Sequence, residues 1–176
     1  MSKVQTMFMI EANPNKEMKI LLRGIKQKLG HTPPHFELFA TVNPTRFKMF
    51  VEEITYLSTH AHINPDFFTF LRYTVASDNG FMYCIELNRK FLLAKGYTLE
   101  QLQKLEGTQK MLALDERHQA LFDAVMLALY TPELFTVEAI DALKILDWSD
   151  ADIFDAVDHG AFLFRFSKVL KAYSKD

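Results

Sequence analysis

The sequence contains a single cysteine, Cys84, among its 176 residues. One cysteine excludes an internal disulfide, and such a chain is typical of a reducing compartment. The N-terminus also lacks the basic segment followed by an apolar one that marks a secretory signal peptide. We therefore expect a cytoplasmic protein.

Long apolar runs and a strong net charge are missing as well. The most apolar region, from Val157 to Leu170, is interrupted by His159, Arg165 and Lys168, and no run reaches the roughly 18 residues of a membrane span. Twenty basic and 22 acidic side chains leave a formal charge of -2, so no global field favours nucleic acid. We expect neither a membrane nor a nucleic-acid partner.

Glycine and proline are scarce, with six of each, and they stand where helices begin or end. Apolar residues recur at helical spacing between them, and no segment alternates with a period of two. The predicted helices span residues 15–29, 36–41, 44–60, 65–78, 81–95, 115–130, 137–146 and 149–173, with a short helix after Thr98. The sequence therefore predicts an all-α protein, a compact multi-helix bundle formed by one domain over residues 1–176.

What is present in the middle of the chain is a recognisable motif frame. A helix from Thr69 leads to an Asn79-Gly80 turn, a second helix carries Cys84, and Lys95-Gly96 closes it. The segments 29–33 and 146–153 add to the same pattern. Over roughly residues 15–173 the chain resembles the alkylhydroperoxidase-D-like and carboxymuconolactone decarboxylase family, in particular its two-halved, peroxidase-related members.

This resemblance implies the helical fold of the family and a set of active-site positions. Active members use a glutamate, two cysteines in Cys-x-x-Cys and a histidine as a proton relay. Those positions fall on Thr69, Phe81, Cys84 and Asn88 in this sequence, so only Cys84 matches. Phe81 cannot act as a resolving thiol, and threonine and asparagine do not titrate near neutral pH. The resemblance also implies a homo-oligomer (dimer, trimer or hexamer) and a small thiol or redox protein as partner.

The residues themselves leave alternatives open at the same positions. Cys84 and Asn88 share an inward face of their helix with Phe81, Ile85 and Leu92. Cys84 is then either a small buried hydrophobic residue or a reactive thiol near a helix N-terminus. Asn88 either bonds a helix carbonyl or lines a polar pocket.

Two further residues are candidates for the same pocket. His159 is either a helix histidine bonded to Asp155 or a proton donor beside Cys84, and Arg72 is either a surface ion-pair member or an anion contact. His60 and His62 form the only close histidine pair, but a third ligand is not evident. We expect no metal site and no cofactor.

Three functions remain. The first is a family relative without the dithiol relay, which lacks dithiol peroxidase activity and binds a small molecule or a partner. The second is a one-cysteine peroxidase or other oxidoreductase in antioxidant defence, with Cys84 oxidised to a sulfenic acid. The third is decarboxylase-like acid/base chemistry with His159 and Arg72, which requires both residues to reach one cavity.

Overall fold

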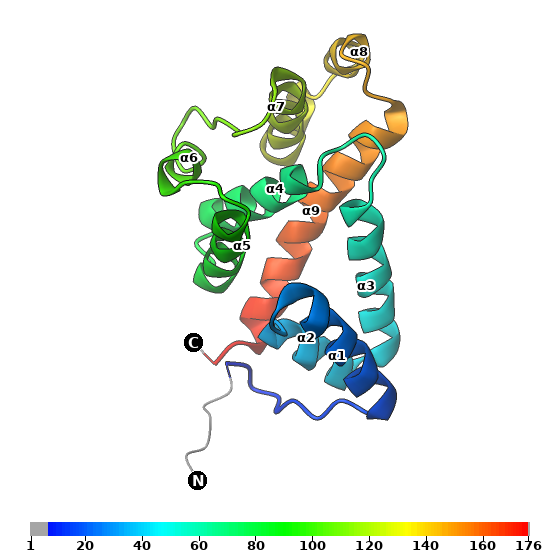
Figure 1. Cartoon of the computed structure of the whole chain (residues 1–176). Coiled ribbons are helices and arrows are strands. Elements are labelled where there is room, and N and C mark those ends of the chain that lie inside the picture. The colour runs from blue at the N-terminus through cyan, green and yellow to red at the C-terminus, as the bar shows by residue number, and fades with distance from the viewer. Residues whose placement is uncertain (1–6, 176) are drawn as a thin grey trace. The chain divides into compact units, whose positions relative to one another are not determined.

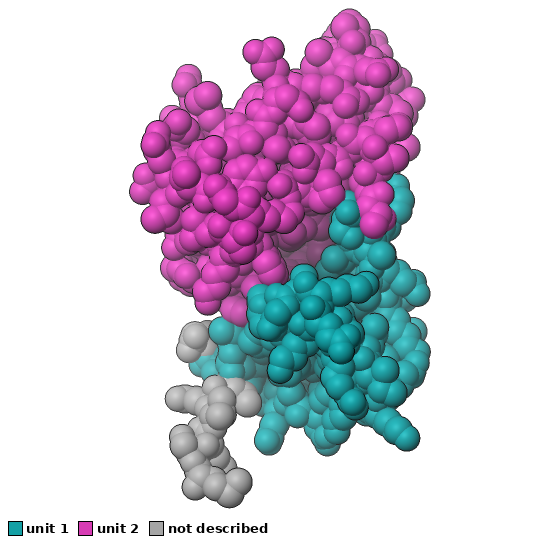
Figure 2. Space-filling model, in the orientation of Figure 1, with its two compact units in different colours: residues 1–58, 169–176 teal, residues 59–168 magenta. Residues whose placement is uncertain are grey.

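The computed structural model describes residues 7–175 and divides the chain into two compact units (Figure 2). Unit 1 comprises residues 1–58 and 169–176, and unit 2 comprises residues 59–168. The expectation of one domain over the whole chain stays a prediction, because two compact units can fold either together or separately.

The described residues form nine α-helices and one short 3₁₀ helix, which confirms the all-α prediction (Figure 1). The helices are α1 (Lys16–Leu29), α2 (Pro34–Val42), α3 (Pro44–Ser58), α4 (Pro65–Asp78), α5 (Met82–Ala94), α6 (Leu99–Gln103), α7 (Glu116–Tyr130), η1 (Pro132–Leu134), α8 (Val137–Ile145) and α9 (Asp150–Tyr173). Within residues 7–175 there is no β-strand, and Phe8 and Ser174 form a single isolated antiparallel bridge.

Local capping explains why the predicted helix boundaries agree with the structure to within about two residues. Asn64 accepts from the backbone N–H of Asp66, and Asp115 accepts from that of His118. Thr98 and Gln101 form the predicted capping box, with distances of 3.2 and 2.8 Å. These bonds satisfy N–H groups that a helix end leaves without partners. The η1 helix was not predicted.

Unit 1 has its own apolar core, formed where α1 and α3 pack on α2. The fully or nearly fully buried members of this core are Met18, Leu22, Phe36, Ala40 and Phe47. The last residues of α9 also belong to this unit, and the backbone of Met9 donates to the carbonyl of Tyr173 at 2.9 Å. Backbone pairing between the segment around Met9 and the end of α9 thus connects these two parts of unit 1.

In unit 2, α4 and α5 form an antiparallel hairpin that positions the candidate site. Gly80 turns the chain with a φ of 60°, a conformation that costs glycine little. The side chain of Asn79 donates to the carbonyl of Val75 at 2.7 Å and so closes the end of α4. Residues equally far from Gly80 on the two helices therefore lie level with one another.

The long helix α9, orange to red in Figure 1, approaches α7 closely at Gly160. A Cβ atom at this position would lie 2.8 Å from Cδ1 of Leu129 and 3.1 Å from Cγ1 of Val125. A larger residue fits there only if the side chains of Leu129 and Val125 move, so glycine permits the close approach of α9, which carries His159, to α7.

Among residues 7–175, no helix combines the length and apolar character needed to cross a bilayer. The expectation drawn from the N-terminus concerns in part residues 1–6, which lie outside the described residues. The cytoplasmic location stays a prediction.

Candidate functional site

The first part of the site comes from one face of α4. Thr69 and Arg72 are three residues apart, so they are neighbours on the helix surface. The Nη2 group of Arg72 donates to Oγ1 of Thr69 at 2.9 Å. The position at which the resemblance would place a glutamate thus holds a neutral acceptor for an arginine.

The second part comes from α5. Asn88 lies sixteen residues after Arg72, with Gly80 midway, and the antiparallel hairpin brings the two side chains together. Nε of Arg72 donates to Oδ1 of Asn88 at 3.0 Å, and Nδ2 of Asn88 donates to the carbonyl oxygen of Cys84 at 2.8 Å. Asn88 therefore links the arginine to the helical turn that carries the cysteine.

The third part is His159 of α9, which is 3% exposed. Its ring stacks on that of Phe162 and meets Phe68 of α4 edge to face, with centroids 5.4 Å apart. Nε2 of His159 lies 3.4 Å from Nη1 of Arg72. Because a guanidinium group can only donate, Nε2 must accept, and the proton of the neutral ring is on Nδ1.

Burial controls the electrostatics of this group. Arg72 is partly buried, and the desolvation that this burial causes lowers the pKa of its guanidinium to about 10. The charge of Cys84 acts in the opposite direction. Burial, followed by the charge of Arg72, also lowers the pKa of His159 well below its ordinary value. At neutral pH the site therefore holds an arginine cation and a neutral histidine.

Several expectations can be compared with this geometry. The inward face of α5 is confirmed, since Phe81, Cys84 and Ile85 are each 8% exposed. The expected bond between His159 and Asp155 is wrong. Nε2 of His159 lies beside Arg72 instead, and the carboxylate of Asp155 lies 3.3 Å from Nε2 of His60. Arg72 is not a surface ion-pair member, because its partners are Thr69, Asn88 and His159.

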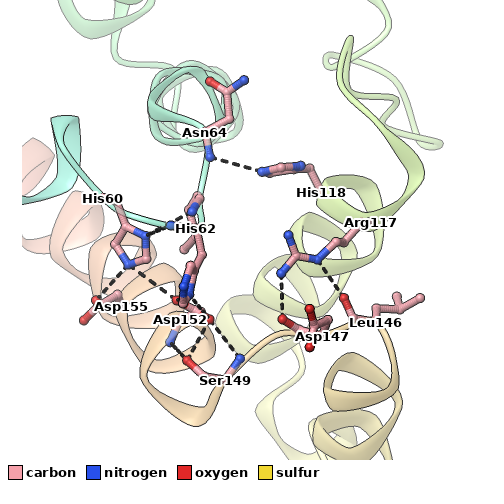
Figure 3. Close-up of polar contacts among 11 residues, drawn as sticks. His60, His62, Asn64, Arg117, His118, Leu146, Asp147, Ser149, Asp152 and Asp155 are labelled. Atoms are coloured by element: carbon pink, nitrogen blue, oxygen red, sulfur yellow. Dashed lines mark hydrogen bonds and ion pairs between the residues drawn. The ribbon is translucent and has the colours of Figure 1, made fainter.

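A second polar cluster joins the turn before α4 to the start of α9 (Figure 3). Nδ1 of His60 accepts from the backbone N–H groups of His62 and Ile63, so its Nε2 carries the proton and faces Asp155. The carboxylate of Asp152 accepts from Ser149 and lies 3.1 Å from Nδ1 of His62. In the described part of the chain, no group of three or more His, Cys, Asp and Glu residues could hold a metal ion. The hydrogen bonds and ion pairs of this cluster link the turn before α4 to the first turn of α9.

Asp152 gives a prediction for the pH dependence of stability. It is 3% exposed, and burial would raise its pKa, but hydrogen bonds from Ser149 and His62 outweigh burial and lower it. A lowered folded-state pKa stabilises the protein above the ordinary value of 3.8, and this stabilisation is lost as pH falls further. We expect Asp152→Asn to lower the free energy of unfolding by about 1–3 kcal/mol at pH 7, with a smaller difference below the ordinary value.

Urea denaturation of both proteins between pH 7 and pH 3 measures this difference. Asp158→Asn is the matched control, because Asp158 is exposed on the same helix. Its effect should stay within about 0.5 kcal/mol. Equal stability of Asp152→Asn and the parent protein at pH 7 would contradict the role of this carboxylate.

Arg117, His118 and Trp148 form a contact that the sequence did not suggest (Figure 3 shows the first two). Arg117 donates to the carbonyls of Leu146 and Asp147 at 2.7 Å each. These bonds provide donors for the carbonyl groups that follow α8, where Asp147 has a φ of 67°. Its guanidinium lies 3.5 Å from the centroid of the Trp148 ring. These contacts stabilise the α8–α9 turn, and none of them involves Cys84 or Arg72.

A cleft of about 280 Å³ lies elsewhere in unit 2, and its lining includes Asp78, Lys110 and Tyr130. None of Thr69, Arg72, Phe81, Cys84, Asn88 and His159 lines this cleft. Asp78 already binds Lys110 at 2.7 Å and Tyr130 at 3.0 Å. The candidate residues therefore do not line this cleft.

Solved structures with the same architecture were found, although no family model and no curated protein matches the sequence. A peroxidase-related protein from Silicibacter sp. TM1040 is 17% identical, with a TM-score of 0.81 over 97% of this chain and 91% of that chain. An alkylhydroperoxidase AhpD core protein from Ralstonia eutropha JMP134 is 13% identical, with a TM-score of 0.80 over 95% and 90%.

A third solved structure is a cysteine-to-alanine variant of the debrominase Bmp8 in complex with 2,3,4-tribromopyrrole. It is 16% identical, with a TM-score of 0.70 over 97% of this chain and 91% of that chain. At these identities the likeness concerns the fold and not the activity. The chain has the all-helical fold of the alkylhydroperoxidase-D-like proteins, as the resemblance in its sequence predicts.

Proposed function

We propose that this protein does not carry out a dithiol peroxidase reaction and works instead through one thiol, Cys84, next to the Arg72 cation. The observation that carries this proposal is which residues occupy the positions of the relay and what they bond. Thr69 and Asn88, which replace the acid and the base, both accept hydrogen bonds from Arg72. Phe81 replaces the other cysteine, so no second thiol in the chain can condense with an oxidised Cys84.

The positive charge of Arg72 favours the ionised form of Cys84, which is the nucleophilic form of a thiol. The thiolate attacks the distal oxygen of a hydroperoxide and breaks the O–O bond. Cys84 becomes a sulfenic acid, and the alkoxide leaves and takes a proton from water. Cys84 is oxidised by two electrons and the peroxide is reduced.

External thiols complete the cycle. A first thiol condenses with the sulfenic acid, which releases water and forms a mixed disulfide with Cys84. A second thiol attacks this disulfide and restores Cys84, so that the two external thiols leave as a disulfide. The small thiol or redox protein expected as partner supplies these reducing equivalents.

Intact mass spectrometry tests the oxidation step. On treatment with cumene hydroperoxide, the protein is expected to gain one oxygen atom, about 16 Da, which dimedone traps and dithiothreitol removes. Cys84→Ser is the matched control and should give no dimedone adduct. If Cys84 stays unmodified at every dose of peroxide, the one-thiol proposal is wrong and the non-catalytic alternative remains.

Decarboxylase-like acid/base chemistry is less well supported. His159 and Arg72 do come together, but the lowered pKa of His159 makes it a weak base that stays neutral near pH 7. The debrominase of the same fold, studied as a cysteine-to-alanine variant, makes halogenated pyrroles reasonable further electrophiles to test against Cys84.

We also propose a homo-oligomer. The region from η1 to the start of α9 exposes several large apolar side chains: Leu134 (57%), Val137 (67%), Ile145 (85%) and Phe154 (68%). Large apolar side chains that are this exposed favour a contact with another copy of the chain, which would remove them from water. Light scattering on the purified protein decides between a monomer and a dimer, trimer or hexamer.

A further inference from the structure

The positive charge of Arg72 has no negative partner of the ordinary kind. Within residues 7–175, no Asp or Glu oxygen lies within 4.0 Å of its guanidinium, and its three bonding partners, Thr69, Asn88 and His159, are all uncharged. A partly buried cation is costly without an anion. The thiolate of Cys84 is one anion that can offset this charge, but only when the thiol is ionised.

The network is also rich in hydrogen-bond donors. A guanidinium group carries five N–H bonds, and three of those of Arg72 have acceptors, which leaves two. Nδ1 of His159, which carries the proton of this ring, is buried and has no acceptor among the described residues. Both the charge and the unused donors favour a ligand that brings negative oxygens.

We infer that Arg72 binds a small planar oxyanion, such as a carboxylate or nitrate, through its two remaining N–H groups, and that this anion competes with the Cys84 thiolate. One of these N–H groups is on Nη1 and the other on Nη2, and the negative oxygens of such an anion can accept from both. The unused Nδ1–H of His159 lies on the other edge of the ring and adds a donor for a larger ligand.

Competition has a defined consequence. An anion at Arg72 offsets the charge that favours the thiolate, so it binds better when Cys84 is a protonated thiol. By linkage, ionisation of Cys84 weakens the binding of the anion by the same factor. The oxyanion is then an inhibitor of the one-thiol chemistry of the same site. In this respect the inference rests on the proposed function, although anion binding itself does not.

Calorimetric titration of the whole protein with sodium formate, sodium nitrate and sodium chloride at constant ionic strength tests the binding. Formate and nitrate should bind more tightly than chloride, because an oxyanion offers a separate oxygen atom to each of the two N–H groups. Arg72→Met should weaken formate binding by at least about tenfold, because it removes a charge-assisted pair. Arg46→Met is the matched control, an exposed arginine whose loss should change nothing.

Equal formate binding by the parent protein and Arg72→Met, or equal binding of formate and chloride, would overturn the inference as a general salt effect. If Arg72→Met does not fold, the parent protein still gives a test. Formate should slow the alkylation of Cys84 by iodoacetamide and move its pH profile to higher pH, whereas an unchanged profile contradicts the competition.

The two proposals can fail separately. Formate binding that depends on Arg72, in a protein whose Cys84 never reacts with peroxide, would leave the anion site standing and remove the one-thiol function. Oxidation of Cys84 that formate does not slow would support the one-thiol function and remove the competing anion site.

Discussion

Replacing Arg72 with methionine is expected to slow the alkylation of Cys84 by iodoacetamide at pH 7 by about tenfold or more, because a nearby opposite charge changes an ionisation equilibrium by about that factor. Methionine fills the space of the aliphatic stem of Arg72, so the substitution removes the charge while keeping part of the packing. Reaction rates are measured by intact mass at several pH values. The pH profile of the variant should lie at higher pH than that of the parent protein.

Two variants separate charge from packing in this experiment. Arg72→Lys keeps the charge but loses the fork that bonds Thr69 and Asn88, so its rate should lie between those of the parent and Arg72→Met. Arg46→Met should react like the parent. Circular dichroism melting shows whether each variant is folded. A folded Arg72→Met that reacts as fast as the parent would remove Arg72 from the thiol chemistry.

Replacing Trp148 with alanine is expected to lower the free energy of unfolding by about 3–5 kcal/mol, the usual cost of deleting a large buried aromatic side chain. Trp148 is 2% exposed, and its Nε1–H donates to the carbonyl of Arg117 at 3.1 Å. Its ring also meets that of His118 edge to face at 5.1 Å. The deletion would leave a cavity and remove the surface on which Arg117 stacks.

Urea denaturation measures this loss, and two other variants define it. Trp148→Phe keeps most of the aromatic volume but loses the hydrogen bond, so it should cost clearly less than the alanine variant. Ile145→Ala removes a neighbouring apolar side chain that is 85% exposed, and its effect should stay within about 0.5 kcal/mol. A loss below about 1 kcal/mol for Trp148→Ala would contradict this role in the core.

The helices could be predicted from the sequence because their ends are determined locally. Asn64, Thr98 and Asp115 cap helices through bonds to residues two or three positions away, and such bonds are visible in the spacing of the sequence. The two candidate contacts inside the α4–α5 hairpin are almost as local. Thr69 and Arg72 share a helix face, and Gly80 lies midway between Arg72 and Asn88.

The partner of His159 could not be predicted in this way. Asp155, four residues earlier on the same helix, is the acceptor that helical spacing suggests. The choice of Arg72 depends instead on how deeply α9 packs against α7 and α4, which Gly160 and the ring of Phe68 determine. Asp155 in turn meets His60, a residue 95 positions away in the chain. Contacts of this range are set by the packing of the whole unit.

The hydrogen bonds from Arg72 to Thr69 and Asn88 tie the fates of these positions together. A glutamate at position 69 and a histidine at position 88 would restore two members of the relay. They would also replace two of the neutral acceptors that Arg72 bonds in this structure. Changes at these positions are therefore expected to be strongly non-additive, since each alters the partners of the others. A variant that restores the glutamate and the histidine is therefore expected to need a change at residue 72 as well.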